Sequence, residues 1–164
     1  DALNLIADNP ELLDLLKQRN QAFPGMTVLT PHPGEAAHLL NTSAAAIQAN
    51  RTEALADLNK LTNSIVVLKG QHTLIASPLH PAEQCAQGNP GMAVGGMGDV
   101  LTGTIAAIAA QGLYHNLNLW ESTCIGVQLH ASAADSLVAK QIGPIGLTPT
   151  EVILEMRSLL NKLL

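Results

Sequence analysis

The sequence predicts a protein of the α/β class built around a parallel sheet. Residues 26–30 and 65–68 are short apolar or β-branched runs that end at Pro or Gly, and both are too short to be buried helices. Residues 43–62 lie between them, are rich in alanine and carry leucines at helical spacing. A strand, a helix and a second strand in this order form the βαβ unit of a parallel sheet.

In the rest of the chain, the sequence signals for strands are weak and those for helices are strong. Residues 73–76 and 84–87 are expected to be small extra strands, and Pro78, His80 and Pro81 indicate a loop between them. Residues 100–110 and 119–140 carry few charges and are predicted to be buried helices. The segment Thr148-Pro149-Thr150-Glu151 is a capping box that begins a last, one-sided apolar helix.

Composition excludes several classes of protein. The 164 residues are 47% hydrophobic, which is enough for a core, and carry a net charge of −5 with eight unclustered Lys and Arg, so we expect no nucleic-acid partner. No apolar run reaches 18 residues and the N-terminus has no signal-peptide pattern, so we expect no membrane span. Cys85 and Cys124 form neither a CxxC motif nor a disulfide framework, which favours the cytoplasm.

The glycine-rich segment Gly95-Gly96-Met97-Gly98-Asp99 is the first candidate for chemistry. Asp99 is the only charged residue between Glu83 and Glu121 and stands at the start of an uncharged helix. Glycines let a backbone approach a ligand, and a helix N-terminus binds anionic oxygens. The pattern predicts a phosphate site in which Asp99 is the general base, and the alternative is a simple helix cap.

Two more loops follow predicted strands. Lys69 is the only Lys or Arg from Leu61 to Ala139, and it opens the segment Lys69-Gly70-Gln71-His72-Thr73. Ligands of open parallel sheets bind beyond the carboxyl ends of the strands, so this segment is expected to meet a phosphate or ribose. The alternative is a lysine whose stem packs while its ammonium reaches water.

The other loop is Thr30-Pro31-His32-Pro33-Gly34-Glu35, in which the prolines stiffen the chain. His32 is a candidate to hydrogen-bond a substrate, and Glu35 to hold Mg²⁺ directly or through water. The alternative is an ordinary turn with Glu35 in the first turn of a helix. Five other histidines lack metal-ligand spacing and are interpreted as surface or satisfied core residues: His38, His72, His80, His115 and His130.

Three motifs together resemble a known family. They are the segment 30–35, the pattern Lys69-Gly70-x-x-Thr73, and the run 88–103, Gly-Asn-Pro-Gly-Met-Ala-Val-Gly-Gly-Met-Gly-Asp-Val-Leu-Thr-Gly. In this order they are similar to the motifs of ADP-dependent NAD(P)H-hydrate dehydratases. The resemblance implies a ribokinase-like three-layer α/β/α sandwich. Since Asp1-Ala2-Leu3-Asn4 resembles the end of a family motif, residues 1–164 are expected to be the C-terminal part of one such domain.

The resemblance also implies a reaction and a role for each motif. Hydrated NADH or NADPH is phosphorylated on its added hydroxyl, with ADP (or ATP) as donor and Mg²⁺ present, and phosphate is then eliminated. Asp99 takes the hydroxyl proton while the backbone of Gly96, Met97 and Gly98 stabilises the phosphoryl group. The nucleotide is bound by Lys69, Gly70, Gln71, His72, Thr73 and Gly98. His32 and Asp99 contact the hydrated substrate, and Glu35 faces the Mg²⁺.

Two departures and two alternatives accompany this hypothesis. Val94 and Met97 stand where hydroxyl residues are common in the family, so the contacts of those hydroxyls are missing here. The alternatives are a hydroxyethylthiazole- or hydroxymethylpyrimidine-type kinase of the same fold, disfavoured by His32, and a non-catalytic nucleotide-binding module. The resemblance further implies a homo-oligomer, often a tetramer, and an upstream epimerase domain. We expect the 164 residues alone to be inactive.

Overall fold

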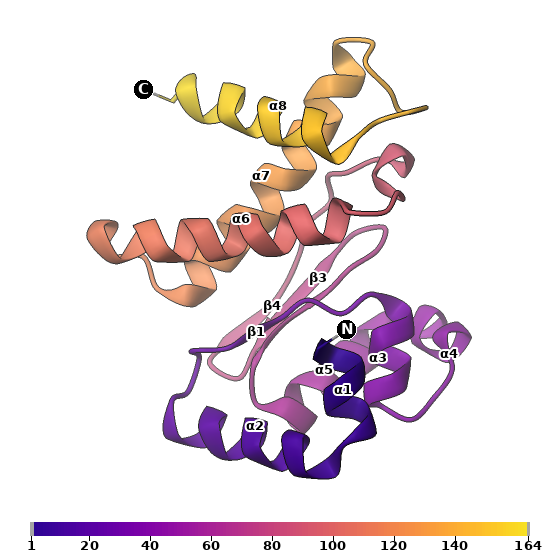
Figure 1. Ribbon diagram of the computed structural model, residues 1–164, viewed down its shortest axis with the longest axis vertical. Helices are drawn as coiled ribbons and strands as arrows, with labels where there is room; N and C mark the ends of the chain where they lie inside the picture. The colour runs from indigo at the N-terminus through magenta and orange to yellow at the C-terminus, as the bar shows by residue number, and fades with distance from the viewer. Residues whose placement is uncertain (1, 164) are drawn as a thin grey trace. The chain divides into compact units, whose positions relative to one another are not determined.

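The computed structural model describes residues 2–163, which form two compact units divided between Gln84 and Cys85. Both units are traced in Figure 1, with the first in indigo to magenta and the second in rose to yellow. The first unit combines helices with a sheet, whereas the described part of the second is helical. The α/β class is therefore confirmed. Asp1, part of the N-terminal resemblance, lies outside the described residues.

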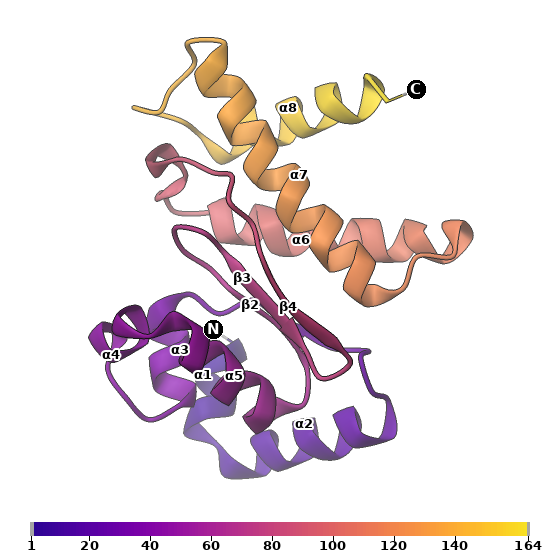
Figure 2. The same cartoon turned by 180° about the vertical axis from the view of Figure 1, so that it is seen from behind.

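The sheet of the first unit is mixed rather than all parallel. Its order is β1-β2-β3-β4, and β1 pairs parallel to β2. The pairs β2–β3 and β3–β4 are antiparallel, and these three strands are labelled in Figure 2. The predicted strand 65–68 is confirmed as the fully buried β2, and the predicted strand 26–30 is reduced to the two residues of β1. The bounds are β1 (Val28–Leu29), β2 (Ile65–Leu68), β3 (Leu74–Ser77) and β4 (His80–Gln84).

The last strand of the sheet corrects the prediction for residues 84–87. Ser77 pairs with His80, so a tight turn at Pro78 and Leu79 closes a hairpin and the strand begins at His80. Pro81 lies inside this strand. Proline is tolerated there because β4 is an edge strand, whose outward backbone groups need no partner in the sheet.

Five helices accompany the sheet, and one prediction among them is wrong. Residues 43–62 form two helices rather than one, because Asn50 has a non-helical backbone (φ −144°, ψ 74°). Its side chain accepts a hydrogen bond from Glu53 N at 3.3 Å, so it starts a new helix. The second of the two packs against β2 and β3. The bounds are α1 (Ala2–Asp8), α2 (Pro10–Ala22), α3 (Pro33–Leu39), α4 (Ala44–Ala49) and α5 (Arg51–Thr62).

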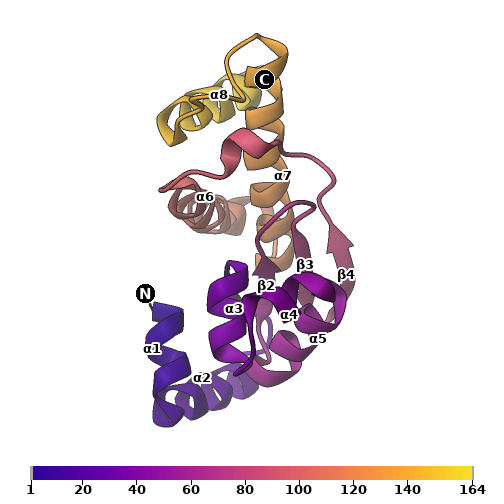
Figure 3. The same cartoon turned by 90° about the vertical axis from the view of Figure 1, so that its right-hand side faces the viewer.

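The second unit is built on three long helices, labelled in Figure 3. One helix begins at Met97, three residues earlier than predicted, and the predicted helix 119–140 is confirmed to within one residue. They cross closely because Gly126 has no side chain: a Cβ there would lie 2.8 Å from Ile105 Cγ1. The elements are η1 (Pro90–Met92), α6 (Met97–Gly112), η2 (Leu113–His115), α7 (Leu119–Ala139) and α8 (Pro149–Asn161).

The capping box of the last helix is confirmed. Glu151 N donates to Thr148 Oγ1 at 3.3 Å and Thr148 N donates to Glu151 Oε2 at 2.8 Å. The expected burial of α6 is only half right. Met97, Leu101 and Ile105 are buried, but the opposite side of the helix is exposed and consists mostly of small or polar residues, which need no burial to be tolerated. Within residues 2–163, no helix is long and apolar enough to cross a bilayer.

Candidate functional site

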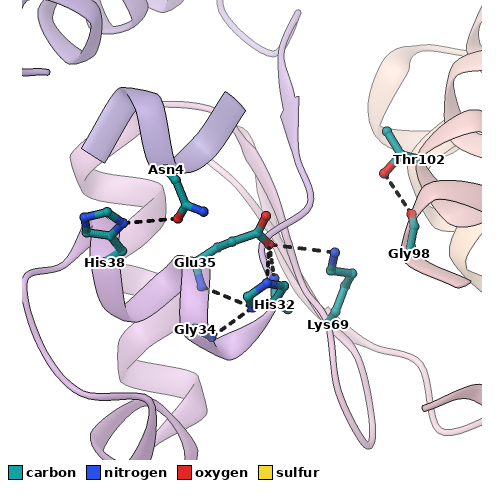
Figure 4. Close-up of polar contacts among 8 residues, drawn as sticks. All are labelled: Asn4, His32, Gly34, Glu35, His38, Lys69, Gly98 and Thr102. Atoms are coloured by element: carbon teal, nitrogen blue, oxygen red, sulfur yellow. Dashed lines mark hydrogen bonds and ion pairs between the residues drawn. The ribbon is translucent and has the colours of Figure 1, made fainter. Parts of the chain in front are cut away.

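The loop between β1 and α3 is held by its own side chains. His32 Nδ1 accepts hydrogen bonds from Gly34 N at 3.0 Å and Glu35 N at 3.2 Å, and His32 N donates to Glu35 Oε2 at 2.7 Å (Figure 4). Glu35 therefore stands in the first turn of a helix, as the structural alternative expected. The imidazole of His32 is still 57% exposed, so its outer edge is accessible to a ligand.

The structure joins this loop to the loop that follows β2. Lys69 N donates to Pro31 O at 2.9 Å. Lys69 Nζ lies 3.8 Å from Glu35 Oε2 (Figure 4). The two side chains are only 23% and 12% exposed. Since β1 and β2 are parallel neighbours, their carboxyl ends share one edge of the sheet. His32, Glu35 and Lys69, predicted separately from the sequence, thus lie together in the first unit.

The segment Lys69–Thr73 is a loop with an unusual backbone. Gly70 has φ +144° and His72 has φ +53°, and Thr73 Oγ1 donates to Gly70 O at 3.1 Å. Gly70, Gln71 and His72 are exposed. The loop therefore presents backbone and side-chain polar groups to solvent at the end of the buried strand β2.

The described residues suit a magnesium ion only if a bound phosphate supplies part of its ligands. Within residues 2–163, no three His, Cys, Asp or Glu side chains are grouped to hold a metal. Glu35 is one carboxylate, and its Oε2 already accepts from His32 N and faces Lys69. Mg²⁺ in nucleotide sites is commonly held by one or two carboxylates, water and phosphate oxygens. Glu35 suits that arrangement better than a cage made by the protein alone.

The glycine turn of the second unit ends in the N-terminus of α6. Gly96 is the N-cap residue with φ +84°, a left-handed conformation that glycine adopts without strain. The first hydrogen bond within the helix runs from Val100 N to Gly96 O at 3.0 Å. The N–H groups of Gly98 and Asp99 precede it and point out of the helix end, where an anion can accept them.

Asp99 is the third residue of α6 and is exposed. No described residue donates a hydrogen bond to its carboxylate, so the alternative of a helix-capping aspartate does not describe this structure. Its partner is left to a ligand or to solvent. The segment 95–99 thus offers a carboxylate beside N–H groups that a helix cannot pair, which is suited to a reaction at an anionic group.

The loop that leads into the glycine turn is fixed by Asp135 of α7, a residue that the sequence did not single out. Asp135 Oδ2 accepts from Gly88 N and Oδ1 from Asn89 Nδ2, both at 2.9 Å. Asn89 Oδ1 in turn accepts from Gly91 N at 3.1 Å. A Cβ on Gly91 would lie 2.4 Å from the carbonyl oxygen of Pro144, so this position requires glycine. Asp135 thus holds the approach to the turn.

We expect Asp135→Ala to lower the free energy of unfolding by about 1–3 kcal/mol, since it leaves two donors without their acceptor. Urea denaturation of the variant and the parent measures this loss. Asp57→Ala, an exposed aspartate of α5, is the control and is expected to change little. Equal unfolding midpoints for Asp135→Ala and Asp57→Ala would contradict the bracing role.

His130 of α7 lies behind the same turn and is 5% exposed. Burial of its imidazole lowers its pKa to about 4, and this outweighs a hydrogen bond to the Met97 backbone, which acts in the opposite direction. Its Nε2 has no partner among the described residues. The prediction of a satisfied core histidine is therefore wrong for this nitrogen. A neutral buried imidazole packs against the first residue of α6.

The burial of His130 predicts a pH dependence of stability. In the unfolded chain the imidazole takes up a proton as the pH falls below 6.5, whereas the folded chain resists it until about pH 4. Stability is therefore present above pH 6.5 and is lost as the pH falls toward 4. Between pH 7 and pH 5 we expect His130→Gln to lose about 2 kcal/mol less than the parent. Identical losses in urea denaturation would contradict this.

Comparisons with known proteins agree on one family. The Carb_kinase family model, described as NAD(P)H-hydrate dehydratase, matches residues 1–157. The ADP-dependent (S)-NAD(P)H-hydrate dehydratase of Neisseria meningitidis is 37% identical over 163 residues, covering 99% of this chain and 52% of that protein. The bifunctional NAD(P)H-hydrate repair enzyme of Coxiella burnetii is 40% identical over 161 residues, or 98% of this chain and 30% of that protein. The chain thus spans about half or less of these relatives.

Solved structures show the same likeness in the fold. An ADP/ATP-dependent NAD(P)H-hydrate dehydratase from Bacillus subtilis, co-crystallised with ATP and Mg²⁺, matches with a TM-score of 0.74 and 27% identity over 82% of this chain and 47% of that one. A ribokinase-like superfamily protein from Enterococcus faecalis matches with a TM-score of 0.69 and 26% identity, covering 93% of this chain and 50% of that one. The predicted ribokinase-like fold is confirmed. The chain belongs to the NAD(P)H-hydrate dehydratase family.

Proposed function

We propose that the protein containing this chain restores hydrated NADH and NADPH, with ADP as the phosphoryl donor. The observation that carries the proposal is Asp99, an exposed carboxylate at the N-terminus of α6 in a chain of this family. Phosphoryl transfer needs a base for the attacking hydroxyl and donors for the phosphoryl oxygens. The segment 95–99 contains both kinds of group.

In the first step the substrate's added hydroxyl is phosphorylated. Its oxygen forms a bond to the terminal phosphorus of ADP, the bond from that phosphorus to the AMP oxygen breaks, and the hydroxyl proton passes to Asp99. The backbone N–H groups of Gly96, Met97 and Gly98 donate to the oxygens of the moving phosphoryl group. AMP leaves with the electron pair of the broken bond.

The second step removes the new phosphate ester. Its carbon–oxygen bond breaks and inorganic phosphate leaves with the electron pair. The neighbouring carbon loses, as a proton to solvent, the hydrogen that hydration had added, and the electrons of that carbon–hydrogen bond form the double bond. The ring double bond is restored. Phosphate is a far better leaving group than hydroxide, which is why phosphorylation makes the dehydration possible at neutral pH.

The nucleotide and the substrate are assigned to the loops of the first unit. We assign the nucleotide to Lys69, Gly70, Gln71, His72 and Thr73 of the first unit. In the second unit, the N–H group of Gly98 is proposed to donate to a phosphate oxygen. The support is the position of Lys69 at the end of β2 and the exposure of the loop.

His32 is assigned to the hydrated nicotinamide, because its imidazole edge is exposed. Glu35 is assigned to the Mg²⁺, through water, because its Oε2 is already engaged. When bound with the nucleotide, this ion would neutralise phosphate charge.

The relatives support proposals about the domain and the full-length protein to which this chain belongs. Residues 1–164 are proposed to be the C-terminal part of one ribokinase-like domain, since they match about half of the solved chains. Relatives described as bifunctional support a fused epimerase domain in the full-length protein. A homo-oligomer and a cytoplasmic location complete the proposal, and the absence of a disulfide between Cys85 and Cys124 agrees with a reducing compartment.

Recovery of absorbance at 340 nm tests the function. Hydrated NADH is incubated with the full-length protein, Mg²⁺ and ADP, and the expected result is a return of the NADH absorbance that requires ADP. Omission of ADP is the control. A return at the same rate without any nucleotide would show that phosphorylation is not part of the reaction.

A further inference from the structure

The guanidinium of Arg51, the first residue of α5, lies against the loop that follows β2. Its Nη2 donates to Leu68 O at 2.9 Å and its Nη1 donates to Gln71 O. We propose that Arg51 is the positioning residue of the nucleotide-binding loop, holding Lys69–Thr73 in the form that receives an adenine nucleotide. This inference rests on the proposed function, since it assigns a residue to the binding of its phosphoryl donor.

The two carbonyls belong to residues three positions apart, so one planar side chain bridges the start and the middle of the loop. These carbonyls are at the point where the β2–β3 pairing ends, since the last paired residues are Leu68 and Leu74. Between Leu68 and Leu74 the loop is not paired to another strand, and Thr73 Oγ1 donates to Gly70 O within it. Arg51 therefore supplies donors where the sheet no longer does.

Gly70 and Arg51 fit each other sterically. A Cβ built on Gly70 would lie 3.1 to 3.3 Å from three atoms of the guanidinium, which is tighter than ordinary contact. Gly70 also has φ +144°, a conformation that other residues adopt only with strain. The absence of a side chain at position 70 thus lets the guanidinium lie flat beneath the loop backbone.

Placing the Arg51 guanidinium against the loop removes part of it from water, which is energetically unfavourable. Partial burial lowers the pKa of the Arg51 guanidinium below its ordinary value, and its Nε is buried without a partner among the described residues. A lysine has a smaller charged group that cannot donate to both carbonyls from one plane. The geometry therefore specifies arginine.

Loss of Arg51 is expected to weaken nucleotide binding but not to slow catalysis at saturating nucleotide. Arg51 contacts the loop backbone, whereas the proposed base, Asp99, belongs to the other unit. Loss of Arg51 frees the loop to take other conformations, and nucleotide binding must then select the competent one. The affinity for the nucleotide falls, while the rate at saturating nucleotide stays near that of the parent.

Arg51→Met, Arg51→Lys and the control Arg157→Met, an exposed arginine of α8, test this in the full-length protein. We expect Arg51→Met to raise the calorimetric Kd and the KM for ADP by about tenfold or more, with kcat within about threefold. Arg51→Lys should recover part of the affinity, and Arg157→Met should match the parent. An unchanged Kd and KM in Arg51→Met would overturn the inference while leaving the proposed function intact.

A second variant covers the case in which Arg51→Met does not fold. Gly70→Ala retains Arg51 but places a methyl group against its guanidinium, and it should raise the Kd and KM for ADP in the same direction. Parental values in that variant would overturn the inference. A parent protein that binds no adenine nucleotide would contradict both the function and the role of Arg51.

Discussion

Asp99→Asn is expected to lower kcat by about 100 to 10,000-fold in the full-length protein, the range that general-base catalysis commonly contributes. The amide keeps the shape of the side chain but cannot accept the hydroxyl proton at a useful rate. ADP affinity should be retained or increase, because the change removes a negative charge near the phosphate site. Initial rates at saturating substrates and calorimetric titration with ADP measure the two effects separately.

The matched control is Asp57→Asn, an exposed aspartate in α5, which should leave kcat and the ADP affinity unchanged. A loss of less than about tenfold in kcat for Asp99→Asn, with the fold intact, would show that Asp99 is not the base. Loss of ADP binding with normal folding would place Asp99 among the binding groups instead.

Gly96→Ala is expected to weaken ADP binding by at least about tenfold. Gly96 has φ +84°, and a residue with a side chain held in such a conformation costs on the order of 1–3 kcal/mol. The turn relieves this strain by rotating, which re-aims the N–H groups at the start of α6. Calorimetry with ADP measures the change, since these groups are proposed to bind the phosphoryl oxygens.

Gly95→Ala is the neighbouring control. A Cβ at position 95 meets nothing within 4 Å, and the φ of Gly95 is not in the left-handed region, so its ADP affinity should stay near that of the parent. If Gly95→Ala and Gly96→Ala bind ADP equally well, the conformation of the turn does not govern anion binding and the proposed phosphate site is wrong.

Elements with strong local signals were predicted well. The strand at residues 65–68 is a run of four β-branched or aliphatic residues, and it is buried on all of them in the structure. The start of α8 is determined by side-chain to backbone hydrogen bonds within Thr148–Glu151, which the local sequence contains in full. The loop of His32 and Glu35 and the turn before Asp99 were found for the same reason, because glycine, proline and isolated charges are local signals.

Elements in which a local sequence preference is overridden by a helix cap or by the surrounding sheet were predicted less well. Asn50 divides residues 43–62 because its side chain caps α5, and the continuous alanine-rich pattern conceals this. Pro81 indicates a loop in the sequence, yet the edge of the sheet tolerates it inside β4. The start of α6 was placed too late because Gly98 and Asp99 have low helix propensity.

The supporting residues of the site had no local signal at all. Asp135 is 47 positions from Gly88, and Arg51 is 20 positions from Gln71. Each acts on the backbone of a loop, so nothing in the loop sequence specifies which side chain holds it. The sequence could therefore predict the segments that we propose to contact ligands, whereas the residues that hold the backbone of those segments required the structure.

Phosphorylation and elimination are proposed to follow one another in one reaction, and a mass balance is the decisive test. Hydrated NADH and ADP are incubated with the full-length protein, NADH is followed at 340 nm, and AMP and inorganic phosphate are counted by ³¹P NMR. We expect one AMP and one inorganic phosphate for each NADH recovered. AMP formed together with a lasting phosphorylated product, and no recovery of NADH, would identify a kinase and contradict the proposed function.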